Sequence, residues 1–392
     1  MRRFWLIVLL LCGYFMAQAD DNTLVVGADT LSYTYTPINS TVKTKKSGFR
    51  DFLSHYGSYP NISKQRGFNY SFMVMPNYSR LTNFGLSASV IGFYNNSKES
   101  NNATPSSVSL TASASLTGAY SLGVAGENIF SSAAHRLKYS LALYSYPTDF
   151  WGVGYDAAIM LSSQSCTESA QRVALGYYYS PIRTLSLGTQ IGFEHVHYNT
   201  TLLPVHGTSA TNLSLIAEYD SRDSKTGPTK GIFLRVQGTI LPKGLGSIDT
   251  TSTAVILSAS GYCKLWQGAV LAAEAHGELR SKTTPWLFYS TAGDSNRMRG
   301  YYSGRFRDRN MVFAQVELRQ KVWRGVGLAV WGGAGNWFGY SEFEWKHTLP
   351  TYGVGLRFSA SERVNLRLDY GLGAKVGGKV INGFVFSVGE AF

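Results

Sequence analysis

The sequence lacks the features that mark several common classes of protein. After residue 19 it has no apolar run of about 18 residues, the length that a membrane-spanning helix needs. Cysteine occurs only 3 times, which excludes a disulfide-rich scaffold, and charged residues make up only 15% of the 392 residues. The formal net charge of +12 is spread along the chain, with no lysine block and no nucleic-acid motif. A helical membrane protein and a nucleic-acid-binding protein are therefore both excluded.

Glycine and aromatic residues are abundant instead. There are 41 glycines, and aromatic residues account for 14% of the chain, with 25 tyrosines among them. Lipid cannot satisfy the open edges of a sheet, so a membrane protein without hydrophobic helices has to be a closed β-barrel. Alternating strands with belts of aromatic residues give this composition. A soluble all-β protein with extended surface strands is the alternative at this point.

One stretch, residues 291–323, combines two patterns that a soluble sheet does not explain. Residues 293–310 contain three glycines, five arginines and two aspartates, which predicts a polar loop without a core of its own. From Met311 the residues alternate strictly, so that Val312 and Val316 lie on one face of a strand and Glu317 and Arg319 lie on the other. This arrangement is expected if the polar face lines the inside of a barrel and the loop folds back into the lumen.

The N-terminus predicts export from the cell. Two arginines precede the apolar run 4–15, and residues 17–19 form a small-x-small cleavage site, so residues 1–19 are predicted to be a signal peptide. Residues 20–66 are predicted to be a periplasmic segment with a short amphipathic helix over residues 48–59, which lies on the inner membrane-water interface or at the barrel mouth. A linker with a nascent helix is the alternative. The barrel domain then covers residues 67–392.

Alternation and turn residues predict sixteen strands, an even number as in single-chain bacterial barrels. The predicted strands are 67–75, 83–94, 107–117, 119–130, 136–146, 171–180, 183–197, 210–219, 231–241, 251–264, 267–280, 310–322, 325–337, 350–359, 363–371 and 382–392. If the first strand runs outward, the short connections lie inside and the long links 147–170, 198–209, 281–309 and 338–349 lie outside. Cys166 and Cys263 then fall at opposite ends of the barrel, so no disulfide is expected between them.

The charged residues of the predicted strands identify the lumenal face. In residues 232–240, apolar side chains such as Leu234 and Val236 alternate with polar ones such as Arg235. Residues 364–370 repeat this pattern, with Arg367 and Asp369 on the polar face. A lipid-facing Arg or Lys at mid-membrane costs about 2–4 kcal/mol, so these charged faces are predicted to line the lumen.

Four motifs, taken in order, resemble the BamA/TamA superfamily of outer-membrane barrels, also called the bacterial surface antigen family. They are the inner turn over residues 219–231, the loop motif Met298-Arg299-Gly300-Tyr301, Glu317 on the following strand, and the final strands 352–357 and 364–371 before a last strand that ends on Phe392. The resemblance covers residues 66–392 and implies an all-β transmembrane antiparallel barrel. Family members usually carry periplasmic POTRA domains, which residues 20–66 are too few to form, so the resemblance is to bare-barrel members.

The resemblance also implies a role for the loop motif. It implies that Arg299 enters the lumen and pairs with lumenal acids, of which Glu317 is one. The second acid of the family stands on the next strand, at a position where this sequence has Gly333. A buried guanidinium without enough acid partners is costly, and Asp369 is the candidate to replace the missing one.

By resemblance, the function is insertion, assembly or translocation of proteins or lipids at the outer membrane. The first and last strands would then meet at a weak lateral seam, because Gly383 and Gly389 lower the pairing strength of the strand that ends at Phe392. A tight bend or close packing is the alternative reading of these glycines. The expected partners are outer-membrane lipids and lipopolysaccharide, client outer-membrane proteins and periplasmic or lipoprotein partners, for a monomeric barrel with no cofactor.

Two other functions have some support in the sequence. The first is a passive channel in which loop 294–309 forms a constriction whose five arginines favour anions. The second is an enzyme, because Ser295 lies in a sequence that weakly resembles an esterase motif and because His195 and His197 could hold a metal. The serine lacks a strand–turn–helix context and the histidines lie beside an outer loop, so neither a catalytic nor a metal site is expected.

Overall fold

The computed structural model describes residues 68–79, 83–94, 106–130, 134–160, 162–199, 207–225, 227–323, 325–359 and 365–392. The predicted signal peptide, the segment 20–66 and its amphipathic helix lie outside the described residues. Within these ranges, no helix has both the length and the apolar character needed to cross a membrane.

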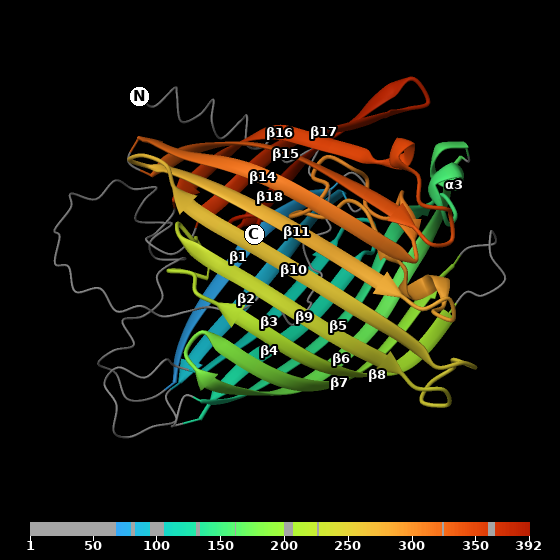
Figure 1. Ribbon diagram of the computed structural model, residues 1–392, viewed down its shortest axis with the longest axis horizontal. Coiled ribbons are helices and arrows are strands. Elements are labelled where there is room, and N and C mark those ends of the chain that lie inside the picture. Colours follow the sequence, from blue (N-terminus) through green and yellow to red (C-terminus); the bar gives the residue numbers. More distant parts are fainter. Residues whose placement is uncertain are drawn as a thin grey trace.

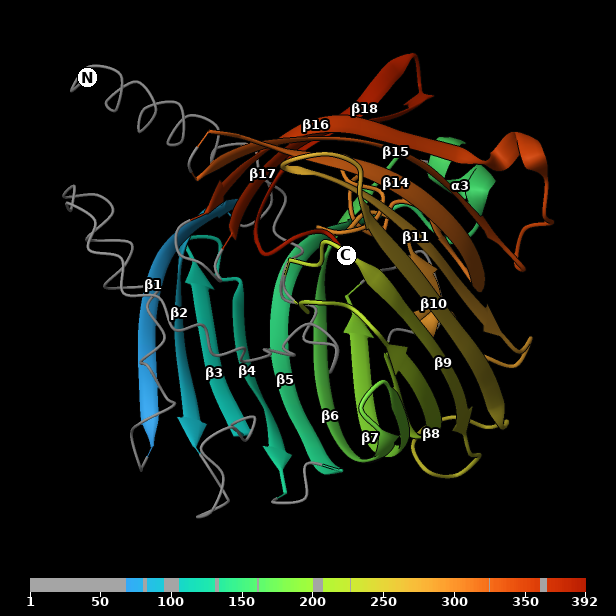
Figure 2. The same cartoon turned by 60° about the vertical axis from the view of Figure 1, so that its left-hand side comes forward.

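Among the described residues, sixteen antiparallel strands form one curved sheet, which confirms the predicted fold class, strand number and strand order (Figures 1 and 2). The strands are β1 (Asn69–Ser79), β2 (Asn83–Tyr94), β3 (Ser106–Ser115), β4 (Tyr120–Ile129), β5 (His135–Phe150), β6 (Gln164–Ile182), β7 (Leu185–Tyr198), β8 (Gly207–Asp220), β9 (Gly231–Leu241), β10 (Ser252–Lys264), β11 (Ala269–Arg280), β14 (Asn310–Trp323), β15 (Val326–Phe338), β16 (Leu349–Ser359), β17 (Asn365–Val376) and β18 (Lys379–Val388).

Each strand pairs with its neighbours in sequence, and β14 follows β11 in the sheet. The connection between these two strands contains the 3-10 helix η1 (Trp286–Phe288) and a separate two-stranded sheet of β12 (Ser290–Thr291) and β13 (Arg307–Asp308). A second 3-10 helix, η2 (Trp345–His347), lies between β15 and β16. The sheet order runs from β1 to β18, and among the described residues no pairing joins these two end strands.

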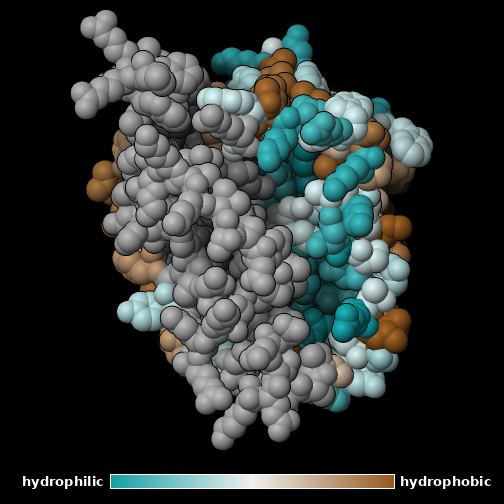
Figure 3. Space-filling model, turned by 90° about the vertical axis from the view of Figure 1, so that its left-hand side faces the viewer, coloured by the Kyte–Doolittle hydropathy of each residue, from teal (hydrophilic) through white to brown (hydrophobic). Residues whose placement is uncertain are grey.

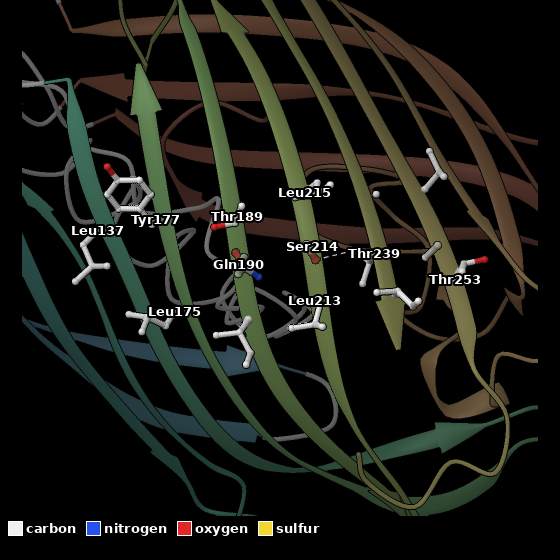
Figure 4. A pocket seen from close by; sticks show the side chains of 15 residues that line it. Leu137, Leu175, Tyr177, Thr189, Gln190, Leu213, Ser214, Leu215, Thr239 and Thr253 are labelled. Atoms are coloured by element: carbon white, nitrogen blue, oxygen red, sulfur yellow. Dashed lines mark hydrogen bonds between the residues drawn. The ribbon is translucent and has the colours of Figure 1, made fainter. Parts of the chain in front are cut away.

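The outer face of the sheet is apolar, as the alternation predicts. Leu234 is 44% exposed on the outer face of β9, whereas Arg235 beside it is only 6% exposed. An apolar groove of about 720 Å³ crosses strands β5 to β10, and its lining includes Leu175, Thr189 and Leu215 (Figure 4). In a bilayer, hydrocarbon chains would cover this face.

The inner face is hydrophilic. A view onto the end of the barrel that lies on the left in Figure 1 shows hydrophilic atoms inside a hollow and hydrophobic atoms on the flanks (Figure 3). Glu317 and Asp369 are both fully buried on this inner face, on β14 and β17. The burial of these acids inside the barrel requires cationic partners there.

The prediction of one long loop over residues 147–170 is wrong at both ends. β5 continues to Phe150 and β6 begins at Gln164, with the short helix α3 (Tyr155–Met160) between them. Pro147 pairs with Thr167 inside this extension, although proline cannot donate to the ladder. A buried cluster that joins the extension to β7 and η1 stabilises it; its members are Tyr144, Phe150, Cys166, Ala170, Val196, Tyr198 and Leu287.

The last strand also differs from its prediction. β18 begins at Lys379 and ends at Val388, so it starts earlier than residue 382 and does not include Phe392. Residues 389–392 leave the sheet and enter the lumen, where Phe392 lies beside Tyr262 of β10. Cys166 and Cys263 are both free, as expected from their separation along the barrel.

Candidate functional site

The loop that joins β12 to β13 makes a tight turn inside the lumen. The Asp294 carboxylate accepts hydrogen bonds from the N–H groups of Asn296 and Arg297, which closes the first part of the turn. Met298 then adopts a φ of 52°, the one left-handed non-glycine residue in the described part of the chain, and Gly300 adopts a φ of 97°. The Tyr301 N–H donates to the Met298 carbonyl at 3.1 Å. These bends present the Arg299 side chain to the wall.

The Arg299 guanidinium is fully buried between two acids and an aromatic ring. Its Nη1 donates to Glu317 and to Asp369, each at 2.7 Å. Its Nη2 donates to Gln315 at 3.2 Å, and its Cζ lies 3.7 Å from the centroid of the Trp331 ring. Hydrogen bonds fix the plane of the guanidinium, and the ring covers one of its faces by a cation–π contact.

Three further arginines share these acids. Arg357 on β16 donates to Asp369 at 2.5 Å and to Glu317 at 3.2 Å, and Arg319 on β14 donates to Glu317 at 2.7 Å. Arg367 on β17 lies 3.6 Å from the Asp369 carboxylate, and its Nη2 donates to the carbonyl of Ser295 in the loop. Glu390, which follows β18, accepts from Arg357 Nε at 2.9 Å. We call Arg299, Arg319, Arg357 and Arg367, together with Glu317, Asp369 and Glu390, the lumenal arginine cluster.

The geometry explains why the second acid comes from β17. A Cβ at Gly333 on β15 would lie 2.6 Å from the Ala314 carbonyl oxygen and 2.8 Å from the Gln315 Cβ, so this position has no room for an aspartate. Asp369 reaches Arg299 from two strands away instead. The sequence pointed to Asp369 because this charged residue lies on the polar face of residues 364–370, which is predicted to line the lumen.

The loop tip rests on a platform of glycines. Gly300 packs so closely on β17 that a Cβ on it would lie 2.5 Å from the backbone of Gly371. A Cβ on Gly371 would lie 2.2 Å from the Arg299 carbonyl oxygen, and one on Gly383 of β18 would lie 3.3 Å from the Gly300 carbonyl oxygen. Gly383 thus lies beneath the loop tip, while Gly389 bends the chain after β18 with a φ of 89°.

Tyr301 extends this attachment toward β16 and β17. Its hydroxyl donates to the Pro350 carbonyl at 2.6 Å and accepts from the Ala374 N–H at 2.7 Å. Its ring fills the space over Gly373, where a Cβ would lie 2.3 Å from the ring. The loop motif therefore contacts the last three strands through main chain and side chains alike.

The remaining arginines of the loop have partners within the protein. Arg297 donates twice to Glu274 of β11, at 2.9 and 2.7 Å. Arg307 lies among the rings of Phe150, Tyr198 and Trp286 and donates to the Tyr198 hydroxyl. Two others donate to main-chain carbonyls, Arg305 to Ala158 and Arg309 to Gly339.

A hydrophobic cluster packs around the loop at the ends of several strands. It joins the loop to α3 and to β14, β15, β16 and β17; its buried members are Ala158, Ala292, Met298, Tyr301, Phe306, Met311, Phe313, Trp337, Leu349 and Val376. Met298 in its strained conformation is only 1% exposed within this cluster. Burial of apolar surface thus holds the loop from the outside, while ion pairs hold its tip from the inside.

The inner turn that follows β8 is a compact hydrogen-bonded unit. Arg222 donates to the Asp220 carboxylate through Nε and Nη2, both at 2.9 Å, and its guanidinium lies over the Phe233 ring. Asp223 accepts from the Thr229 N–H and hydroxyl and from the Lys230 N–H. Burial opposes ionisation of Asp223, but these hydrogen bonds outweigh it and lower the pKa of its carboxyl.

The residues considered for catalysis do not come together. The Ser295 hydroxyl donates to the Asn296 side chain at 3.3 Å. His195 and His197 are on the face of β7 that carries Ile191 and Phe193, which is the outer face. Within the described ranges, no group of three or more His, Cys, Asp or Glu side chains is placed to hold a metal ion.

Comparisons with known proteins agree with this architecture. The Omp85 superfamily domain matches residues 51–392. The fold is similar to BamA from Haemophilus ducreyi lacking POTRA domains 1–3, with a TM-score of 0.57 at 14% identity over 86% of this chain and 76% of that one. It is also similar to CdiB from Acinetobacter baumannii, with a TM-score of 0.55 at 14% identity over 82% of this chain and 59% of that one.

CdiB from Escherichia coli gives a TM-score of 0.58 at 14% identity, over 83% of this chain and 63% of that one. Among curated proteins, none matches the sequence. The family match extends from before β1 to the last residue, so it covers all sixteen strands and the lumenal arginine cluster. The chain belongs to the Omp85 superfamily of outer-membrane barrel proteins.

Proposed function

We propose that this barrel inserts or translocates proteins, or lipids, at the bacterial outer membrane through a lateral seam between β1 and β18. The observation that supports this is the pairing pattern. Each strand in the order from β1 to β18 is hydrogen-bonded to the next one, whereas none of the described residues pairs β1 with β18. The family and the fold indicate the outer membrane as the location.

An incompletely paired edge has a physical consequence in lipid. The hydrocarbon region offers no hydrogen bonds to free N–H and C=O groups, so each unsatisfied group costs several kcal/mol. A second strand from a client protein can satisfy such an edge by adding to the sheet. The partners of this chain are then client outer-membrane proteins, with surrounding lipid and lipopolysaccharide and with periplasmic or lipoprotein factors that deliver clients to a monomeric barrel.

A cross-link across the seam tests this proposal. In a background with Cys166→Ala and Cys263→Ala, cysteines at Phe72 on β1 and at Phe384 or Phe386 on β18 are joined by short bismaleimides of increasing length. We expect the cross-linked protein, reconstituted in vesicles, to lose the ability to accelerate folding of a second outer-membrane barrel, because the edges can no longer separate. The folding rate of the second barrel is followed on gels, where its folded and unfolded forms run as separate bands when the sample is not heated.

The matched control joins two strands that are already paired. Leu86 on β2 and Ala114 on β3 are register partners, so a cross-link between cysteines at these positions constrains nothing that opens. It should leave the acceleration unchanged. Full acceleration by the protein cross-linked between β1 and β18 would reject the seam.

A passive channel is the alternative function, and the loop contacts bear on it. Each of the five loop arginines is engaged by a protein partner, so the loop presents a packed plug rather than a charged constriction. We expect low conductance of the intact barrel in planar bilayers and a large rise after deletion of residues 294–309. Stable, anion-selective conductance of the intact barrel would favour the channel instead.

A further inference from the structure

The segment after β18 turns away from the sheet into the lumen. β18 ends at Val388, and the left-handed conformation of Gly389 redirects the chain. Figure 2 shows the C-terminus within the ring of strands rather than on its rim. Ala391 is only 3% exposed, so these residues are packed against the lumenal wall.

This segment contacts the lumenal arginine cluster through both polar and aromatic groups. The Glu390 carboxylate accepts from Arg357 Nε at 2.9 Å and lies 3.5 Å from Arg319 Nε. A main-chain oxygen of Phe392, the last residue of the sequence, accepts from Arg319 Nη2 at 3.0 Å. The Phe392 ring lies 5.2 Å from the Arg319 Cζ and 6.3 Å from the Tyr262 ring.

The wall residues that receive the segment are held in place independently of it. Arg319 is also bound to Glu317, and Arg357 to both Glu317 and Asp369. All of these side chains stand on paired strands and have partners other than residues 389–392. The receiving surface is therefore anchored in the barrel wall.

Charge in the cluster makes an anionic occupant necessary. With residues 389–392 in place, the four guanidinium groups face Glu317, Asp369, Glu390 and a main-chain oxygen of Phe392; without these residues, the same four face only Glu317 and Asp369. In addition, Arg319 Nη1 is buried and has no hydrogen-bond partner among the described residues. A buried surplus of positive charge is unfavourable, so departure of Glu390 leaves a site that another carboxylate would fill.

We propose that Arg319, Arg357 and Tyr262 form a binding site for a peptide segment in which an acidic residue stands two positions before an aromatic one. Residues 389–392 occupy this site as an internal ligand that another segment of the same chemistry can displace. The carboxylate binds the two guanidinium groups, and the aromatic ring lies between Arg319 and Tyr262. The site is distinct from the seam, because it needs no strand pairing.

Peptide binding to purified protein in detergent tests the proposal. The probe is a fluorescein-labelled Ser-Val-Gly-Glu-Ala-Phe amide, whose glutamate is its only carboxylate apart from the dye. We expect it to bind the Glu390→Gln/Phe392→Ala variant, whose own segment is weakened, at least about tenfold more tightly than the wild type, since a charge-assisted hydrogen bond contributes at least that factor. Fluorescence anisotropy gives the Kd.

Matched probes and variants show whether the recognition is as proposed. A peptide with Gln in place of Glu, or with Ala in place of Phe, should bind at least about tenfold more weakly. Arg319→Gln, added to the double variant, should abolish binding, and inorganic phosphate should compete only weakly because it lacks the ring. Equal binding of the Glu and Gln peptides to a variant that still shows heat-modifiable folding would overturn the proposal.

A measurement on the wild-type protein removes dependence on the variants. Excess unlabelled peptide should increase amide hydrogen exchange over residues 389–392 without changing exchange in β17. No change in exchange at saturating peptide would count against displacement. Because neither measurement involves client insertion, failure here leaves the seam proposal standing, and failure of the cross-linking experiment leaves this one standing.

Discussion

Glu317→Gln is expected to cause the largest loss of stability of any single substitution in the barrel wall. Glu317 is fully buried and accepts from Arg299, Arg319 and Arg357 at once. Its neutralisation leaves Asp369 and Glu390 as the acidic side chains for four guanidinium groups, in a site where Arg299 and Arg367 are fully buried. Removing one partner of a buried ion pair typically costs about 3–5 kcal/mol, and we expect a value in this range from urea unfolding in lipid vesicles.

A second substitution should partly repair the first. Arg299→Met in the Glu317→Gln background removes one of the surplus cations, so the double variant should be more stable than the sum of the two single effects. The control is Glu344→Gln, which removes an exposed ion pair with Lys346 and should have little measurable effect. Equal urea-unfolding midpoints for Glu317→Gln and Glu344→Gln would show that the lumenal arginine cluster does not stabilise the barrel.

Gly371→Val is expected to expel the loop tip from the lumen. A Cβ at this position would lie 2.2 Å from the Arg299 carbonyl oxygen and 2.8 Å from the Gly300 nitrogen, and both are main-chain atoms that cannot rotate away. Valine itself suits a strand, so β17 should still form. Arg299, which is 0% exposed in the native structure, should then become accessible to trypsin.

Limited proteolysis with mass spectrometry measures this directly, as cleavage after Arg297 or Arg299 from the outer side of vesicles. Gly332→Val is the matched control, because a Cβ at Gly332 on β15 meets nothing within 4 Å. It should leave the loop as resistant as in the wild type. If Gly371→Val also leaves the loop resistant, the tip does not depend on the glycine platform. Loss of loop docking should also reduce client folding, because the loop contacts β16, β17 and β18 together.

Local patterns were sufficient to predict the strands but not all of their ends. The alternation of apolar and polar residues in 310–319 and 231–241 is a property of neighbouring residues, and the observed faces of β14 and β9 agree with it. The extension of β5 past Pro147 escaped prediction because it depends on a cluster with Tyr198 and Leu287 from elsewhere in the chain. Turn propensity is a local quantity, and here long-range burial overrode it.

The candidate site was predictable in part for the same reason. The resemblance pointed to Arg299 and Glu317, and the lumenal face of residues 364–370 pointed to Asp369. Glu390 was not predicted to belong to the site, because residues 382–392 were predicted to form one continuous strand. Only the left-handed turn at Gly389 takes its carboxylate to Arg357, on a strand more than 30 residues earlier.

The sequence by itself determined that this protein is a barrel of sixteen strands with an apolar outside and a charged inside, because side-chain direction alternates along every strand and lipid excludes unpaired charge. The tertiary structure decided which charges meet. Arg299 binds acids from two strands that are 52 positions apart in sequence, Glu317 and Asp369, and their meeting depends on how the sheet curves and how the loop packs on Gly371. Such contacts arise from distances across the lumen, which no local pattern encodes.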